Sequence, residues 1–174
     1  MTVLLKISGC VLLLVIMMGG ARAQRPEPPP FVSAEHRAIL KRWLMQRPQL
    51  RVASDEACGR CEQELANQRR LSGEDYHPYY AVGDFNGDGK KDFAVALIEL
   101  EENAEGRIEQ KFAVAVFNAP FRGRNVKPAF FKDELNLRDG GLFFGPSDHR
   151  LSIGLFTNDQ RLTLVPRGRG YIAQ

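Results

Sequence analysis

The sequence predicts an α+β fold in which two N-terminal helices pack on an antiparallel β-sheet. Residues 33–72 place apolar side chains at helical spacing, whereas short apolar runs separated by turn residues begin near Tyr76. Helices followed by a run of strands are typical of the α+β class. The 174 residues are enough for one domain with a hydrophobic core, which is expected to span residues 31–174.

The first helix is expected to begin after Ser33 and to end before Pro48. A serine hydroxyl can accept a hydrogen bond from the first turn of a helix, and proline cannot continue one. His36 is expected on the exposed side of this helix. The apolar residues that fall on its other face are Ile39, Leu40, Trp43 and Leu44.

The second helix is expected to run from about Ser54 to about residue 71. Asp55 and Glu56 would lie in its first turn, where the helix dipole favours carboxylates. The buried stripe of this helix is expected to consist of Cys58, Cys61 and Leu65.

The first two strand candidates are residues 93–98 and 111–117, two apolar runs joined by a polar connection that contains Asn103 and Gly106. Such a connection predicts a β-hairpin. A tight turn at residues 157–160 would join two later strands. The later strands are expected at residues 129–131, 142–144, 151–156, 161–165 and 171–172.

Residues 1–23 are expected to form a signal peptide. Lys6 supplies a positive n-region, residues 7–18 form a mostly apolar h-region, and residues 21–23 read Ala-Arg-Ala, a typical cleavage site. The apolar stretch is shorter than the roughly 20 residues that span a membrane. Cys10 closes a sequence that resembles a lipoprotein cleavage box, but most of the apolar stretch follows this cysteine. We therefore expect a periplasmic or secreted protein without a membrane span.

The mature chain would begin with the proline-rich residues 24–30, which favour an extended spacer. Removal of Lys6 and Arg22 leaves 22 of the 24 cations against 21 anions, a net charge of +1. This balance gives no reason to expect a nucleic acid or an anionic membrane as partner. One small basic run is interpreted as a solubility feature of a loop, namely Arg122, Arg124 and Lys127.

Residues 84–92 read Asp-Phe-Asn-Gly-Asp-Gly-Lys-Lys-Asp, with side-chain oxygens at loop positions 1, 3, 5 and 9. Calcium takes about six to eight oxygen ligands, and a tightly curled loop can turn alternate side chains toward one centre. Three carboxylates crowded together would repel one another without a cation. The expected calcium ligands are the side chains of Asp84, Asn86, Asp88 and Asp92 and the backbone carbonyl of Lys90.

The same register excludes two other ion-binding or phosphate-binding loops. An EF-hand requires glutamate at loop position 12, which is Val95 in this chain. A phosphate-binding loop requires a hydroxyl residue after its lysine, whereas Lys91 follows Lys90. The remaining alternative is a solvated hairpin turn, because Asp, Asn and Gly all favour turns.

Residues 82–95 resemble the calcium loop of the FG-GAP/VCBS repeats, which occur in integrin-type β-propellers and in many secreted bacterial proteins. The resemblance implies a structural calcium ion held by the five residues named above. A propeller repeats its blade several times, and this sequence contains no second copy of the loop. The resemblance therefore covers the loop and does not extend to a propeller.

Cys58 and Cys61 are separated by two residues and are the cysteines left in the mature chain. In an exported protein this pair suits a structural disulfide, which stabilises only modestly across so short a loop. The same spacing occurs in thiol–disulfide exchange enzymes, although no βαβ pattern surrounds it here. A zinc site would need His77 and His149 as further ligands, and two free thiols are the last alternative.

The sequence thus predicts an exported calcium-binding module that acts by binding a protein or glycan ligand rather than by catalysis. It contains none of the familiar hydrolase or metalloprotease signatures. The alternative function is that of a periplasmic thiol–disulfide oxidoreductase that uses Cys58 and Cys61.

Overall fold

The computed structural model describes residues 27–58, 61–102, 105, 108–123, 126–135, 141–147, 149–156 and 158–174. The expected signal peptide, residues 1–23, lies outside the described residues, as do Asn103 and Gly106 of the predicted hairpin connection. The structure places Glu27 and Pro30, from the expected spacer, against the first helix. Lys41 Nζ lies 2.6 Å from Glu27 Oε1, and Arg37 Nη1 donates to the Pro30 carbonyl at 3.0 Å.

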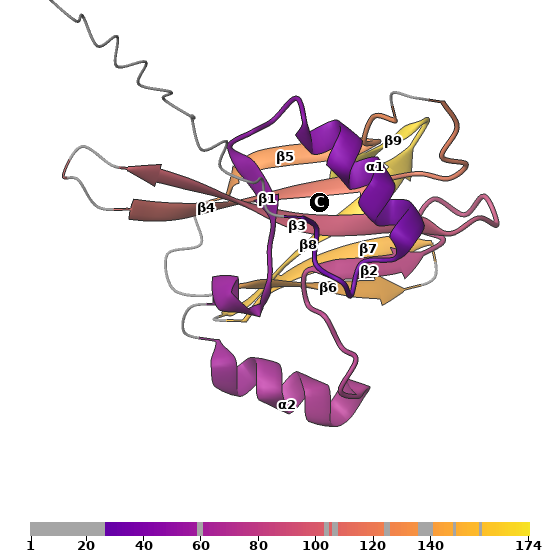
Figure 1. Ribbon diagram of the computed structural model, residues 1–174. Helices are drawn as coiled ribbons and strands as arrows, with labels where there is room; N and C mark the ends of the chain where they lie inside the picture. The colour runs from indigo at the N-terminus through magenta and orange to yellow at the C-terminus, as the bar shows by residue number, and fades with distance from the viewer. Residues whose placement is uncertain are drawn as a thin grey trace, which may run out of the picture.

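The described part of the chain is mostly β, with nine strands in two antiparallel sheets (Figure 1). The first sheet has the order β1-β3-β4-β5, and β2 also pairs with β3; the second sheet has the order β6-β7-β8-β9. The first sheet contains β1 (Leu50–Val52), β2 (Tyr80–Gly83), β3 (Asp92–Glu102), β4 (Ile108–Phe117) and β5 (Phe130–Leu135). The second contains β6 (Leu142–Ser147), β7 (Arg150–Leu155), β8 (Asn158–Arg167) and β9 (Gly170–Ala173).

The predicted α+β fold, with two helices on one sheet, is wrong. Helix α1 (Ala34–Leu44) covers one face of the first sheet, and the second sheet covers the other face (Figure 1). The physical reason is visible in β3 and β4, which are apolar on both faces. A helix can bury only one of those faces, so the C-terminal strands form a second sheet that buries the other.

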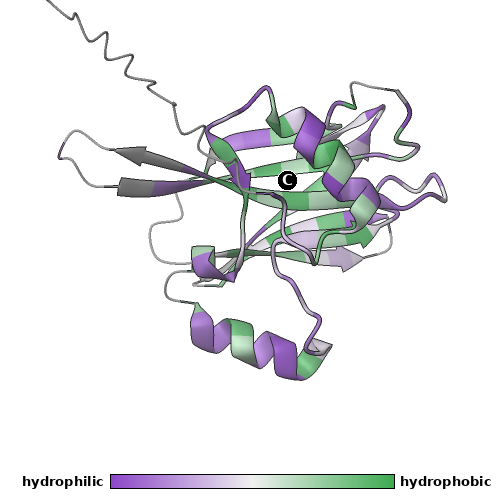
Figure 2. Ribbon diagram, in the orientation of Figure 1, coloured by the Kyte–Doolittle hydropathy of each residue, from purple (hydrophilic) through white to green (hydrophobic). Residues whose placement is uncertain are grey.

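Alternate residues of the central strands belong to two separate hydrophobic cores. The core under α1 receives Phe93, Val95 and Leu97 from β3. The core between the sheets receives Ala94, Ala96 and Ile98 from the same strand. Figure 2 shows β3 and β4 as hydrophobic where they run between these layers.

Helix α1 follows the sequence-based prediction closely. Its N-cap is Ser33, whose hydroxyl oxygen accepts a hydrogen bond from the His36 amide at 3.3 Å. The four apolar residues that were expected to share a face are all buried. The helix ends at Leu44, before Pro48.

The second predicted helix is divided and lies apart from the sheets. A 3₁₀ helix spans Asp55–Cys58, and α2 spans Glu62–Ser72. Leu65 is the single buried residue of α2, which is otherwise largely hydrophilic (Figure 2). A stripe this narrow gives α2 too little apolar surface to pack on a sheet, which explains the error in the prediction.

Candidate functional site

The aspartate-rich loop connects β2 to β3 at one end of the first sheet. The two strands are antiparallel, and Gly83 opposite Asp92 is the last pair before the loop. Gly87 and Gly89 have φ angles of 76° and 79°, in a region of backbone conformation that residues other than glycine rarely adopt. These two glycines therefore permit the curl that the sequence predicted.

Asp84 organises the loop through its carboxylate. Oδ1 accepts hydrogen bonds from the amides of Gly87 at 2.8 Å and Asp88 at 3.0 Å, and Oδ2 accepts one from Gly89 at 2.9 Å. Desolvation alone would raise the pKa of Asp84, but the three backbone donors outweigh it, and the pKa is lowered. Asp84 is thus held as a carboxylate at the start of the loop.

Asn86 and Asp88 continue the same pattern of side-chain to backbone bonds. Asn86 Oδ1 accepts from the Asp88 amide at 2.9 Å, and Asp88 Oδ1 accepts from the Lys90 amide at 2.9 Å. The Lys90 ammonium lies 3.4 Å from Asp88 Oδ2, and its side chain remains 52% exposed. All the predicted ligands from 84 to 90 therefore lie in one hydrogen-bonded turn.

Asp92 differs from the other predicted ligands because it is fully buried. Its Oδ1 accepts from the Ala119 amide at 2.9 Å, and its Oδ2 accepts from the Phe85 amide at 3.2 Å. The Tyr171 hydroxyl lies 3.3 Å from Oδ2 and 2.7 Å from Asn118 Oδ1. Desolvation raises the pKa of Asp92, although these hydrogen bonds oppose the shift.

The chemistry of this donor set fits calcium. All five predicted ligands present oxygen, three of them as carboxylates, and hard cations such as calcium prefer oxygen. Asp84 and Asp88 retain side-chain exposures of 24% and 35%, so an ion in solution can reach them. Within the described residues, no three His, Cys, Asp or Glu side chains are grouped as metal ligands. The convergence of the loop oxygens on one ion stays a prediction.

His149 approaches the loop from the β6–β7 turn, a neighbour that sequence reasoning missed. It has a φ of 59°, and its Nδ1 lies 3.6 Å from Asp84 Oδ2. A Cβ atom at Gly87 would lie 3.3 Å from His149 Nδ1, so glycine at 87 leaves room for the histidine. No local sequence signal relates a residue of the second sheet to this loop.

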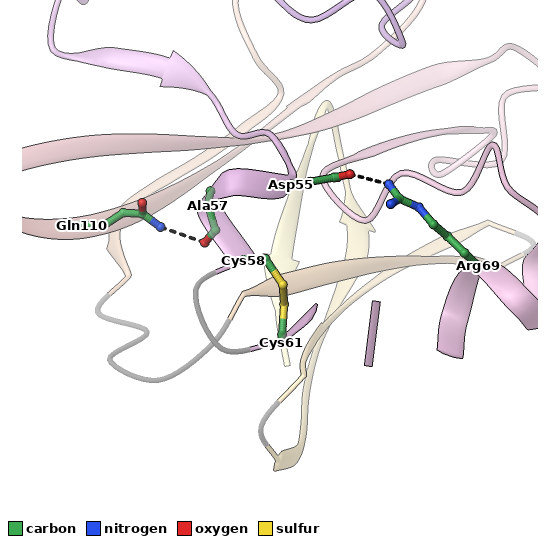
Figure 3. The surroundings of a disulfide bond; sticks show 6 residues. All are labelled: Asp55, Ala57, Cys58, Cys61, Arg69 and Gln110. Carbon is green, nitrogen blue, oxygen red and sulfur yellow. Dashed lines mark hydrogen bonds and ion pairs between the residues drawn. A yellow bond between two sulfur atoms is a disulfide. The ribbon is translucent and has the colours of Figure 1, made fainter. Parts of the chain in front are cut away.

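Cys58 and Cys61 form a disulfide whose Cα atoms are 5.4 Å apart (Figure 3). Both cysteines are only 1% exposed. The disulfide begins at the end of the 3₁₀ helix, where Asp55 pairs with Arg69 at 2.5 Å and the Ala57 carbonyl accepts from Gln110 at 2.9 Å. A thiol–disulfide exchange enzyme needs an accessible sulfur, so this burial weighs against that function.

The two histidines proposed as partners for a zinc site lie elsewhere. His77 stacks on Phe31 with ring centroids 4.2 Å apart, whereas His149 faces Asp84. The expectation that His36 is exposed is also wrong, because His36 is buried and its Nδ1 lies 2.7 Å from the Tyr80 hydroxyl. The helical spacing indicates this burial, since His36 precedes Ile39 by three residues and therefore lies on the same, buried face.

Comparison of the chain with protein-family models, with curated proteins and with solved structures found no match. In the part of the chain that the structure describes, no helix has the length and apolar character needed to cross a membrane.

Proposed function

We propose that the loop of residues 84–92 binds one calcium ion and that the protein acts outside the cytoplasm as a binding module. The observation that carries this proposal is the set of three loop amides bound by Asp84. They fix the backbone in a curl with the oxygen-bearing residues at alternate positions. A plain solvated turn does not require a carboxylate to bind three successive amides.

The ion would have a structural role in this proposal. Asp84, Asn86, Asp88, Asp92 and the Lys90 carbonyl would hold it, and the bound cation would offset repulsion among the carboxylates. Asp92 hydrogen-bonds to the loop at Phe85 and to the body of the domain at Ala119. Calcium binding would therefore stiffen the β2–β3 connection and present one fixed surface to a protein or glycan ligand.

Thermal unfolding of the mature chain tests this proposal. Extracellular calcium modules bind with Kd values of roughly 10⁻⁴ to 10⁻³ M. At about 10 mM calcium the expected stabilisation is about 1–3 kcal/mol, which shifts Tm upward by several degrees relative to chelator. Asp88→Ala should abolish this shift, whereas Lys91→Gln, at a loop position without a predicted ligand atom, should keep it. Identical curves with calcium and with chelator would contradict the proposal.

The binding role is tested separately by affinity capture. Wild-type protein and Asp88→Ala are each immobilised and exposed to envelope and culture-medium fractions with calcium or with chelator. A partner retained by wild type with calcium, and lost with chelator or in the variant, supports the role. A partner retained equally under all these conditions would separate ligand binding from the loop.

A further inference from the structure

A pocket of about 360 Å³ lies between α1 and the segment that precedes β5, away from the calcium loop. Its apolar wall consists of Ile39, Trp43, Val126 and Pro128. Trp43 is mostly buried and packs edge-on against Phe117 and Phe131, with ring centroids 5.5 Å apart in each pair. The pocket thus has a rigid aromatic wall that is part of the core under α1.

The polar part of the pocket is cationic. Arg42, Arg47 and Lys127 line it together with Gln46, and none of the lining residues is acidic. Within the described residues, Arg47 and Lys127 have no carboxylate at ion-pair distance. Three cations around one hollow create a positive potential that favours an anion. Lys127, interpreted from the sequence as a solubility feature, belongs to this pocket.

Arg47 is oriented before any ligand binds. Its guanidinium carbon lies 4.4 Å from the centre of the Trp43 ring and 5.8 Å from that of Phe131. Stacking on aromatic rings holds the planar guanidinium while leaving its N–H edge available for hydrogen bonds to oxygens. Because the Arg47 side chain is already ordered, it loses less conformational entropy when a ligand binds.

We propose that this pocket binds a small ligand that carries a carboxylate or a phosphate on an apolar body. Arg47 and Lys127 contact the anionic group, since guanidinium and ammonium donors form strong charge-assisted hydrogen bonds with such oxygens. The apolar body lies along Trp43 and Pro128. This site is independent of the calcium loop and of the function proposed for it.

Intrinsic fluorescence reports on the pocket directly, because Trp43 is the single tryptophan of the chain. The mature protein is titrated with benzoate, with phenyl phosphate and with inorganic phosphate, at constant ionic strength. We expect a saturable change in emission with benzoate or phenyl phosphate. The probe that binds with the higher affinity identifies the preferred anionic group. Inorganic phosphate should bind more weakly because it has no apolar body.

Two pocket variants and one control complete the test. Arg47→Gln and Lys127→Gln should each weaken binding about tenfold, the usual effect of losing one charge-assisted hydrogen bond. Lys127→Gln leaves the stack on Trp43 intact, so it remains informative if Arg47→Gln alters emission or folding. Arg70→Gln, on exposed α2, should bind as wild type does. Absence of saturation with all three probes, or equal affinity in wild type and Lys127→Gln, would overturn the proposal.

Discussion

Apart from tyrosines, His36 and Asp92 are the two buried polar or charged side chains among the described residues. Burial of such groups is costly unless they are hydrogen-bonded, and both of them are. Asp92 accepts hydrogen bonds at the end of the loop, whereas His36 lies among aromatic rings. His36 stacks on Phe93 at 4.0 Å and meets Phe121 edge-on at 5.3 Å.

We expect His36 to make the free energy of unfolding depend on pH. Desolvation lowers its pKa below the ordinary value, although the nearby Glu35 carboxylate opposes the shift. Because the unfolded chain binds this proton more tightly, the contribution of neutral His36 to stability is fully present above about pH 6.5. This contribution is lost as pH falls through the lowered pKa of the folded state. Denaturant unfolding over this range should show the decline in wild type.

His36→Phe provides the comparison, since phenylalanine keeps a ring against Phe93 and removes the titrating group. The decline in stability with falling pH should be smaller in this variant. Some decline should remain because desolvation also lowers the pKa of His77. An unchanged dependence on pH in His36→Phe would contradict the assignment.

At the scale of single elements, only a few contacts hold α2 in place. Leu65 and the disulfide form a small cluster with the partly buried Tyr76 and Phe156. Arg69 adds an ion pair to Asp55. With so little buried apolar surface, the helix has few interactions to hold it, and its stability should be local rather than shared with the sheets.

Removal of the disulfide should therefore loosen α2 selectively. In the chain-entropy model a bridge across so short a loop contributes about 2 kcal/mol. Hydrogen exchange of the α2 amides should accelerate in Cys58→Ala/Cys61→Ala, while exchange in β3 and β4 changes little. Leu65→Ala should have a similar local effect. Equal acceleration in α2 and in the central strands would show that α2 unfolds together with the whole domain.

At the scale of the whole molecule, the two sheets are joined by side chains and by few backbone bonds. One backbone bond links the Phe144 amide to the Pro78 carbonyl at 3.0 Å. Tyr171 of β9 crosses from the second sheet to reach Asn118 and Asp92 beside the first. This hydroxyl therefore connects the second sheet to Asp92, the carboxylate at the end of the aspartate-rich loop.

Tyr171→Phe should lower the free energy of unfolding by about 1–3 kcal/mol, because it leaves the buried Asp92 carboxylate and the half-buried Asn118 side chain without one of their donors. Chemical denaturation measures this loss. Tyr79→Phe is the matched control, since the buried Tyr79 hydroxyl has no hydrogen-bond partner in the described structure. Its removal should leave stability unchanged or raise it. Similar losses in both variants would indicate that packing, and not the hydrogen bond, is responsible.

The sequence predicted local features of this fold better than their arrangement. The capped α1, the pairing of β3 with β4, and the curl of residues 84–92 are all encoded by nearby residues. The approach of His149 and Tyr171 to the loop depends on how the second sheet packs, and residue spacing does not report it. The short β1 was also missed, because three residues carry too little pattern.

The layered burial of β3 and β4 has a consequence for how the chain selects its strand register. In most sheets a slip by one residue exposes apolar side chains to water. Here both faces are buried, so the same slip would move side chains from one hydrophobic core to the other. We infer that volume distinguishes the register in the middle of the hairpin, where each pair from Ala94 to Leu97 joins an alanine to a larger side chain, as in Ala94 with Val116 and Leu97 with Ala113. Enlarging one of these buried alanines should therefore lower stability more than a polar substitution on the protein surface does.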